Sequence, residues 1–159
     1  MFVLTMKSHP ALVALALLTL TPLASAQTAA LKADNPHLAP SGGTLALTAT
    51  LSYQGSPGAV GWSVELPADW SLVSVAGQTP PQIAPEAGTR GTLEFAFTEV
   101  PAGRAEFTIV VRYPANAPSF SAKPAVILRQ DGQLSQLKPA PVTFIGDDTP
   151  RQRTRDSQS

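Results

Sequence analysis

Three glutamates are the carboxylates of this chain whose placement could support chemistry. Glu65, Glu94 and Glu106 each occupy the polar position in a segment where apolar and polar residues alternate. If those segments pair with one another, the carboxylates could form a row suited to Ca²⁺ binding or to glycoside hydrolysis. Charges at such positions also keep a strand soluble and discourage edge-to-edge pairing. We expect this second role, because nothing in the sequence fixes their separation and no glycine-rich metal loop accompanies them.

Histidine chemistry has little support in the sequence. His37 lies in a proline-flanked stretch with Asp34 nearby, and no serine stands out as its partner for nucleophilic catalysis. We therefore expect His37 to be a solvated loop residue. Asp147 and Asp148 form a weak calcium candidate in a polar stretch near the C-terminus. We predict no catalytic residue, no metal site and no cofactor.

Cysteine is absent from all 159 residues. This excludes disulfides, thiolate metal sites, a cysteine nucleophile and a lipid-modified cysteine. The domain must therefore be held together by its apolar core. A domain of about 110 residues buries roughly 60–70% of the surface of its unfolded chain, which is enough for that purpose.

The first 26 residues have the pattern of a secretory signal. Lys7 precedes an apolar run over residues 11–20, and Ala24-Ser25-Ala26 offers small residues for cleavage before Gln27. The apolar run is shorter than the ~20 residues that a spanning helix needs, so we expect no stable membrane span after cleavage. The expected location is the periplasm or the cell exterior.

The charge balance argues against a nucleic-acid partner. Of 11 basic residues, Lys7 belongs to the predicted signal, which leaves 10 against 11 acidic residues and a net charge of −1. Nucleic-acid binding needs a basic stripe, which a near-neutral chain does not predict.

The segment around Trp62 organises the expected fold. Val60, Trp62, Val64 and Leu66 alternate with small or polar residues, which indicates a strand buried on one face. Pro67 ends this strand, because proline cannot donate a hydrogen bond to a sheet. Further strands are predicted at residues 44–53, 71–76, 92–98, 105–113, 125–130, 133–137 and 142–145. Eight or nine short strands without helical periodicity predict an all-β fold, a single two-sheet antiparallel β-sandwich.

Large apolar residues on the inward side of these strands form the predicted core. They are Leu47, Leu51, Trp62, Val64, Leu66, Leu93, Phe95, Phe97, Phe107, Ile109 and Val111. Trp70 is an exception among the aromatic residues, since it follows the turn at residues 67–69 and could be partly exposed. It is our one candidate binding residue, because exposed aromatic rings have an apolar face for a ligand to stack on.

Four segments make up the expected domain organisation. They are a signal peptide at 1–26, a lead-in segment at 27–37, the sandwich at 38–146 and a flexible polar tail at 147–159. The segment 28–33 could pair as a first strand, but Asn35-Pro36 interrupts it, so it is assigned to the lead-in. In the tail, Arg151, Arg153 and Arg155 alternate with polar residues, and an anionic-partner patch is the alternative to a flexible tail.

Two parts of the chain carry a family resemblance. The segment 59–74 is similar to the strand, Leu-Pro turn and tryptophan unit of cohesin-like modules in bacterial secreted proteins. Segments 91–98, 101–103 and 107–114 resemble the later strands of that unit. The resemblance implies an immunoglobulin-like or jelly-roll sandwich and non-catalytic binding, either of dockerin modules or of polysaccharide. It transfers no binding residue to this sequence.

These observations predict a secreted, non-catalytic binding or interaction module with a protein or polysaccharide partner. The first alternative is a structural envelope protein that associates with its own copies. The second is an enzyme, a glycoside hydrolase that uses Glu65, Glu94 or Glu106.

Overall fold

A computed structural model describes residues 27–146 of the chain. The predicted signal peptide and the predicted tail, with Asp147, Asp148 and the three tail arginines, lie outside the described residues. No helix within 27–146 is long and apolar enough to cross a membrane.

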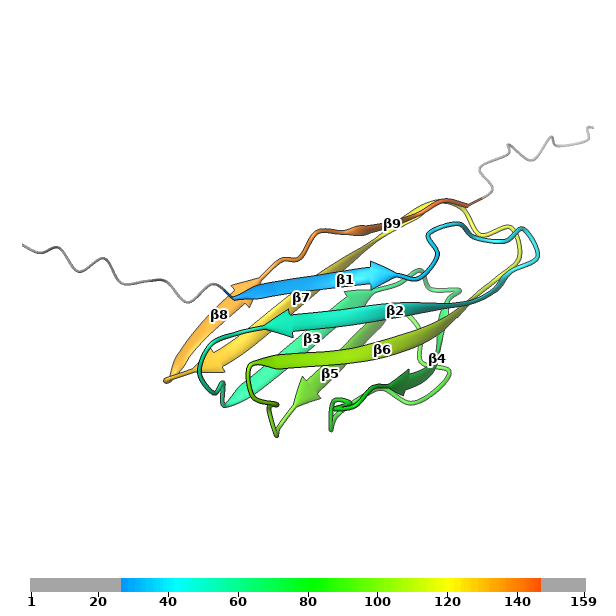
Figure 1. Cartoon of the computed structure of the whole chain (residues 1–159). Helices are drawn as coiled ribbons and strands as arrows, with labels where there is room; N and C mark the ends of the chain where they lie inside the picture. The colour runs from blue at the N-terminus through cyan, green and yellow to red at the C-terminus, as the bar shows by residue number, and fades with distance from the viewer. Residues whose placement is uncertain (1–26, 147–159) are drawn as a thin grey trace, which may run out of the picture.

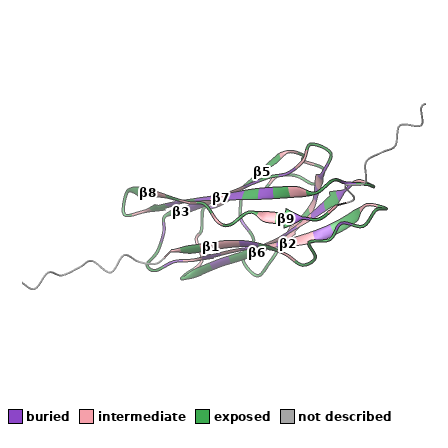
Figure 2. Cartoon of the chain, turned by 90° about the horizontal axis from the view of Figure 1, so that it is seen from above, coloured by how far each residue is buried: buried purple, intermediate pink, exposed green. Residues whose placement is uncertain are grey.

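Nine strands form two antiparallel sheets that pack face to face (Figures 1 and 2). The strands are β1 (Thr28–Ala33), β2 (Gly43–Ser52), β3 (Ala59–Glu65), β4 (Ser71–Ala76), β5 (Thr92–Phe97), β6 (Arg104–Tyr113), β7 (Phe120–Gln130), β8 (Gln133–Leu137) and β9 (Val142–Phe144). One sheet has the order β1-β2-β6-β4, and the other has the order β5-β3-β7-β8, with β9 also paired to β7. The prediction of an all-β, two-sheet antiparallel sandwich is confirmed.

Alternation along each strand explains why the layers form. In β3, Val60, Trp62 and Val64 are buried, whereas Ala59 and Glu65 are exposed. Strands β2 and β6 repeat the pattern over ten residues each. Because side chains alternate between the two faces of a sheet, each sheet has one apolar inner face to bury against the other.

Aromatic rings fill the centre of the core. Phe107 of β6 contacts three rings of the opposite sheet, with centroid distances of 6.1 Å to Trp62, 5.2 Å to Phe95 and 5.7 Å to Phe97. The contact with Trp62 is T-shaped, an arrangement that aromatic pairs favour. All the residues predicted for the core from the sequence are buried, none more than 4% exposed.

The sandwich begins earlier than the sequence pattern indicates. Residues 28–33 form β1 and pair with β2 from Thr28 opposite Ser52 to Ala33 opposite Leu47. Leu31 is buried, and the side chain of Asp34 accepts hydrogen bonds from the backbone N–H groups of Asn35 and Ala46. The break at Asn35-Pro36 therefore ends a paired strand, and residues 28–33 of the expected lead-in belong to the four-stranded sheet.

Strand β7 also begins earlier than expected, at Phe120, and contains Pro124. One edge of β7 pairs with β3 through residues 123–129. The opposite edge pairs with β9 at residues 120–122 and with β8 at residues 126–130. Pro124 lies where that second edge changes partner, and a residue without an N–H group is tolerated there.

Candidate functional site

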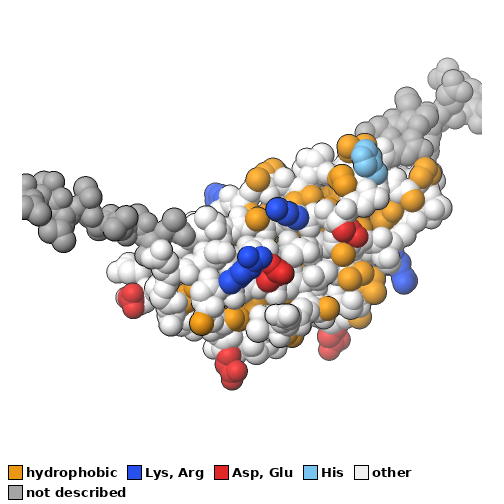
Figure 3. All heavy atoms as spheres, in the orientation of Figure 1, with side chains coloured by type: hydrophobic (Ala, Val, Ile, Leu, Met, Phe, Trp, Pro, Cys, Tyr) orange, Lys and Arg blue, Asp and Glu red, His pale blue; other side chains and the backbone are white. Residues whose placement is uncertain are grey.

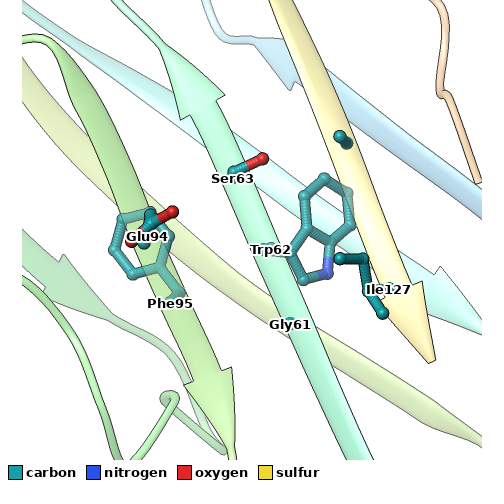
Figure 4. A pocket seen from close by; sticks show the side chains of 7 residues that line it. Gly61, Trp62, Ser63, Glu94, Phe95 and Ile127 are labelled. Carbon is teal, nitrogen blue, oxygen red and sulfur yellow. The ribbon is translucent and has the colours of Figure 1, made fainter. Parts of the chain in front are cut away.

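The outer face of the five-stranded sheet carries a shallow apolar channel. Gly61 lies at the middle of β3, opposite Ala96 of β5 on one side and Ile127 of β7 on the other. A hollow of about 210 Å³ above it is lined by Gly61, Trp62, Ser63, Glu94, Phe95, Ala125 and Ile127. Figure 4 shows Ser63, Glu94 and Ile127 around the empty position at Gly61.

A second hollow of about 340 Å³ continues the first along the strands. It shares Gly61 and Ile127 and adds Ala96, Arg129 and Leu134 to the lining. We call the two hollows together the Gly61 channel. Ile127 is 51% exposed and Leu134 is 66% exposed, and they are two of the four large hydrophobic residues exposed within 27–146.

The backbone does not require glycine at position 61. Gly61 has no positive φ, and a Cβ atom there would meet only the carbonyl oxygens of Phe95 and Ile127, at 3.9 Å and 4.0 Å. Those are ordinary van der Waals distances. Glycine inside a strand weakens the strand and often marks a close approach of another group. The missing side chain therefore creates the channel without a local structural need for it.

Charged residues lie at both ends of the channel. At one end, Glu65 of β3 is opposite Lys123 of β7, and Glu94 of β5 is opposite Ser63 of β3. Glu65 is two residues along β3 from Ser63. Arg129 lies at the other end. The one ion pair among the described residues joins Arg104 to Glu106, so Glu65 and Lys123 are not paired with each other.

The structure separates the three candidate glutamates. Glu65 and Glu94 lie on adjacent strands of the five-stranded sheet, where Glu65 pairs with Thr92 and Glu94 with Ser63. Glu106 lies on the outer face of the other sheet, opposite Thr50. The whole sandwich thus separates Glu106 from the other two. Within the described residues no group of three histidine, cysteine or acidic side chains is placed to hold a metal ion.

Glu106 has a small polar network of its own. Arg104 forms an ion pair with it, and the Thr50 hydroxyl donates a hydrogen bond of 3.4 Å. The hydrogen bond and then the charge of Arg104 hold the pKa of Glu106 below its ordinary value. Figure 3 views the molecule from the side of this sheet and shows charged side chains of both signs scattered among polar and hydrophobic surface.

The expectation that Trp70 is partly exposed is wrong. Its side chain is 1% exposed, because the turn at residues 67–69 directs it inward. It contacts Tyr113, Phe120 and Phe144, with ring centroids 5.5, 6.1 and 5.4 Å away. A ring enclosed in this way has no face available to a ligand.

Two other residues considered in the sequence analysis, His37 and Trp62, take part in the fold. His37 is exposed, and its backbone forms a bridge with Ile145. Trp62 is 2% exposed and its Nε1–H group is buried without a hydrogen-bond partner. Trp62 therefore serves as a packing residue in an apolar environment.

Sequence reasoning missed the Gly61 channel, although one pattern could have indicated it. Residues 126–128 read Val-Ile-Leu, so a strand through them must direct at least one large apolar side chain outward. Val126 and Leu128 are buried, and Ile127 is the exposed one. Its neighbour Gly61 reads in sequence only as a small residue of a half-buried strand.

A wider hollow lies at one end of the sandwich. It has a volume of about 580 Å³ and is lined by residues 78–82 and 99–101, which include three prolines. Gln82 of this region accepts hydrogen bonds from the backbone of Thr98 and Glu99. The same loop pairs through Ile83 with Ala96, and so covers the free edge of β5.

Comparisons with known proteins show the fold. No protein-family model matches the sequence, and a search of curated proteins also found no match. The structure is similar to the full-length major pilin SpaD from Corynebacterium diphtheriae, with a TM-score of 0.55 and 13% identity over 74% of this chain and 35% of the pilin. The chain thus spans about a third of that protein.

Two further similar structures are binding domains of other proteins. One is the chitin-binding domain of a chitinase from Pyrococcus furiosus, with a TM-score of 0.44 and 17% identity over 70% of this chain and 99% of that one. The other is the collagen-binding domain of a Staphylococcus aureus adhesin, with a TM-score of 0.45 and 8% identity over 75% of this chain and 97% of that one. Of these three structures only the pilin has a TM-score above 0.5, and at 13% identity that match shows the fold alone. The resemblance to cohesin-like modules stays a prediction.

Proposed function

We propose that this chain is a secreted, non-catalytic module that binds protein through the Gly61 channel. The observation that supports the proposal is the pair of exposed apolar side chains, Ile127 and Leu134, beside a strand position without a side chain. Charged residues surround this apolar strip. An apolar patch with a polar rim is typical of a protein contact surface.

The aromatic residues favour a protein partner over a polysaccharide. Every aromatic ring within 27–146 is buried, apart from Phe120, which is half-buried. A flat sheet that holds a sugar chain needs exposed rings as stacking platforms. Aliphatic side chains around a hollow instead suit the apolar side chains of another protein. Polysaccharide binding is the second candidate.

The distribution of the carboxylates favours binding over glycoside hydrolysis. A glycosidase needs two carboxylates about 5–10 Å apart across a cleft. Glu94 lines the Gly61 channel, whereas Glu106 lines a hollow on the opposite sheet. Neither hollow has a second carboxylate in its lining. Glu65 lies on the same face as Glu94, one row along on the adjacent strand, so these two carboxylates are neighbours on one sheet surface and do not face each other across a cleft.

Export rests on the signal pattern of the first 26 residues. The expected cleavage before Gln27 falls one residue ahead of β1, which begins at Thr28. Removal of the signal would therefore leave every strand of both sheets intact.

The test is a capture experiment with the exported chain. Immobilised wild-type protein is incubated with envelope extract of the source cells, and a polysaccharide panel is run in parallel. The variant carries Ile127→Ser and Leu134→Ser. Its matched control is Ile145→Ser, because Ile145 is 50% exposed but lies outside the channel. We expect a protein partner that the control retains and the double variant loses.

Two results would overturn the proposed function. Polysaccharide binding that both variants retain would assign the role to another surface. Partner capture that is unchanged in the double variant would exclude the channel as the contact surface.

A further inference from the structure

We infer that the protein which occupies the Gly61 channel is a second copy of this chain, related to the first by a twofold axis along the strands. The inference rests on the proposed function and names its partner. It comes from the residue rows across β3 and β7. The outward row pairs are Glu65 with Lys123, Ser63 with Ala125, Gly61 with Ile127, and Ala59 with Arg129.

A twofold axis that runs parallel to β3 and β7 and midway between them places β3 of one copy over β7 of the other, and β7 over β3. This rotation leaves the position of each residue row along the strands unchanged, so Gly61 faces Ile127 of the second copy. By symmetry Ile127 faces the second Gly61, and each isoleucine side chain enters the hollow of the other copy. A closed twofold interface requires such reciprocal contacts.

The charges agree with the same axis. Glu65 of one copy faces Lys123 of the other, and this contact also occurs twice. Neither side chain makes an ion pair with another residue in 27–146, so within the described structure both are available to the second copy. A twofold axis across the strands, centred on the same rows, would instead place Lys123 over Arg129 of the second copy. That arrangement brings like charges together, which interfaces avoid.

The size of the face sets the expected strength. Four strands spaced ~4.8 Å apart and about six residues long cover roughly 20 Å by 20 Å. About 400 Å² from each copy gives a total of about 800 Å², which is below the ~1,200 Å² of a standard specific interface and in the range of weak, transient contacts. Sheet twist concentrates contact at the centre, where the residues are small. We therefore expect a weak dimer with a dissociation constant of roughly micromolar or higher.

Gly61→Val is the decisive variant. Valine favours strands and the added Cβ atom has ordinary room, so the monomer should fold at least as stably as wild type. The new side chain fills the hollow that receives Ile127 of the second copy. Sedimentation equilibrium of the exported chain over a wide concentration range should show the dimer dissociation constant raised by at least about 30-fold. Ile145→Ser serves as the control and should leave it unchanged.

A charge exchange tests the axis independently of the hollow. Glu65→Lys and Lys123→Glu each place like charges face to face, and each should raise the dissociation constant by roughly tenfold. The double exchange restores opposite charges in both contacts and should return the constant to within about threefold of wild type. Thermal unfolding checks that each variant is folded.

A wild-type chain that stays monomeric at every concentration would overturn the inference. So would a dimer that Gly61→Val leaves unchanged, or one that the double charge exchange does not restore. The capture experiment separates these failures from failure of the proposed function. The wild-type chain could prove monomeric while the Ile127→Ser and Leu134→Ser variant loses capture of another envelope protein. In that case the channel binds protein, and only the inference of a second copy fails.

Discussion

On the outer face of the four-stranded sheet, polar side chains of β2 and β6 face each other in most rows, and one row among them, Ala46 opposite Val110, is apolar. Thr44 is opposite Arg112, Thr48 opposite Thr108, and Thr50 opposite Glu106. The outer face of the five-stranded sheet instead has glycine, alanine and isoleucine at its centre. None of the large exposed hydrophobic residues within 27–146 lies on β1, β2, β4 or β6.

The inner faces of the two sheets do not differ in this way. Both supply large apolar residues to one core, and Phe107 of one sheet is packed among Trp62, Phe95 and Phe97 of the other. The fold therefore constrains the inner positions of both sheets equally. The outer positions are free of that constraint, so a composition that departs from a soluble surface there indicates a contact surface.

The largest expected effect tests whether stability comes from the inner faces. Trp62→Ala removes the largest ring beside Phe107 and should lower the free energy of unfolding by about 3–5 kcal/mol. Trp62→Phe should cost much less, because the indole N–H is buried without a partner and phenylalanine has no such group to satisfy. Urea unfolding of both variants measures the difference.

Equal losses for the two Trp62 variants would contradict this assignment. The comparison between the sheets would also fail if Gly61→Val, one residue away on the outer face, were as destabilising as Trp62→Ala. We expect that outer-face substitution to stay within the range of ordinary surface changes, about 0.5 kcal/mol.

Local alternation made much of this inner and outer division predictable from the sequence. The rule that side chains alternate along a strand is enough to assign Val60, Trp62 and Val64 to the core. It failed at Trp70, because an aromatic residue after a turn has the same local pattern whether it points inward or outward. The rings that enclose it, Phe120 and Phe144, lie far along the chain and belong to β7 and β9.

The features of the fold and of the site that the sequence did not predict all depend on pairing between residues far apart in the chain. Pro124 reads as a break, and only the change of partner along one edge of β7 shows why a strand tolerates it. The Gly61 channel depends on the pairing of Gly61 with Ile127, which are 66 positions apart in the sequence. Periodicity shows which face a residue occupies but not its neighbours on that face.

A smaller effect is expected at the end of the four-stranded sheet, where Tyr53 follows β2. Its hydroxyl donates a hydrogen bond to the carbonyl of Pro101 in the turn before β6. Tyr53→Phe should lower the free energy of unfolding by about 1 kcal/mol at neutral pH. Burial raises the pKa of the Tyr53 phenol. The contribution of the neutral phenol is thus complete below its unfolded pKa of about 10 and is lost as the pH rises through the folded value.

Unfolding of the wild type and Tyr53→Phe by urea, repeated from pH 8 upward, checks this sign. The difference between the two proteins should shrink above about pH 10. A difference that grows with pH would mean that the folded protein favours the phenolate, which is the opposite of an effect of burial.

The smallest effect is expected on the polar face itself, at the pair Arg104 and Glu106. Arg104→Ala removes the hydrogen bond and the charge that hold the pKa of Glu106 low, so NMR titration should show that pKa return toward its ordinary value. Thr50→Val removes only the weaker hydrogen bond and should raise the pKa less. Because the folded pKa is lowered, the contribution of Arg104 is present above the unfolded pKa of about 4.3 and is lost as the pH falls through the folded value. Both side chains are largely exposed, so the unfolding midpoint at neutral pH should not change measurably. A clear loss of stability would show that the outer face of the four-stranded sheet contributes to the stability of the fold. The contrast between that face and the Gly61 channel would then no longer identify the channel as a contact surface.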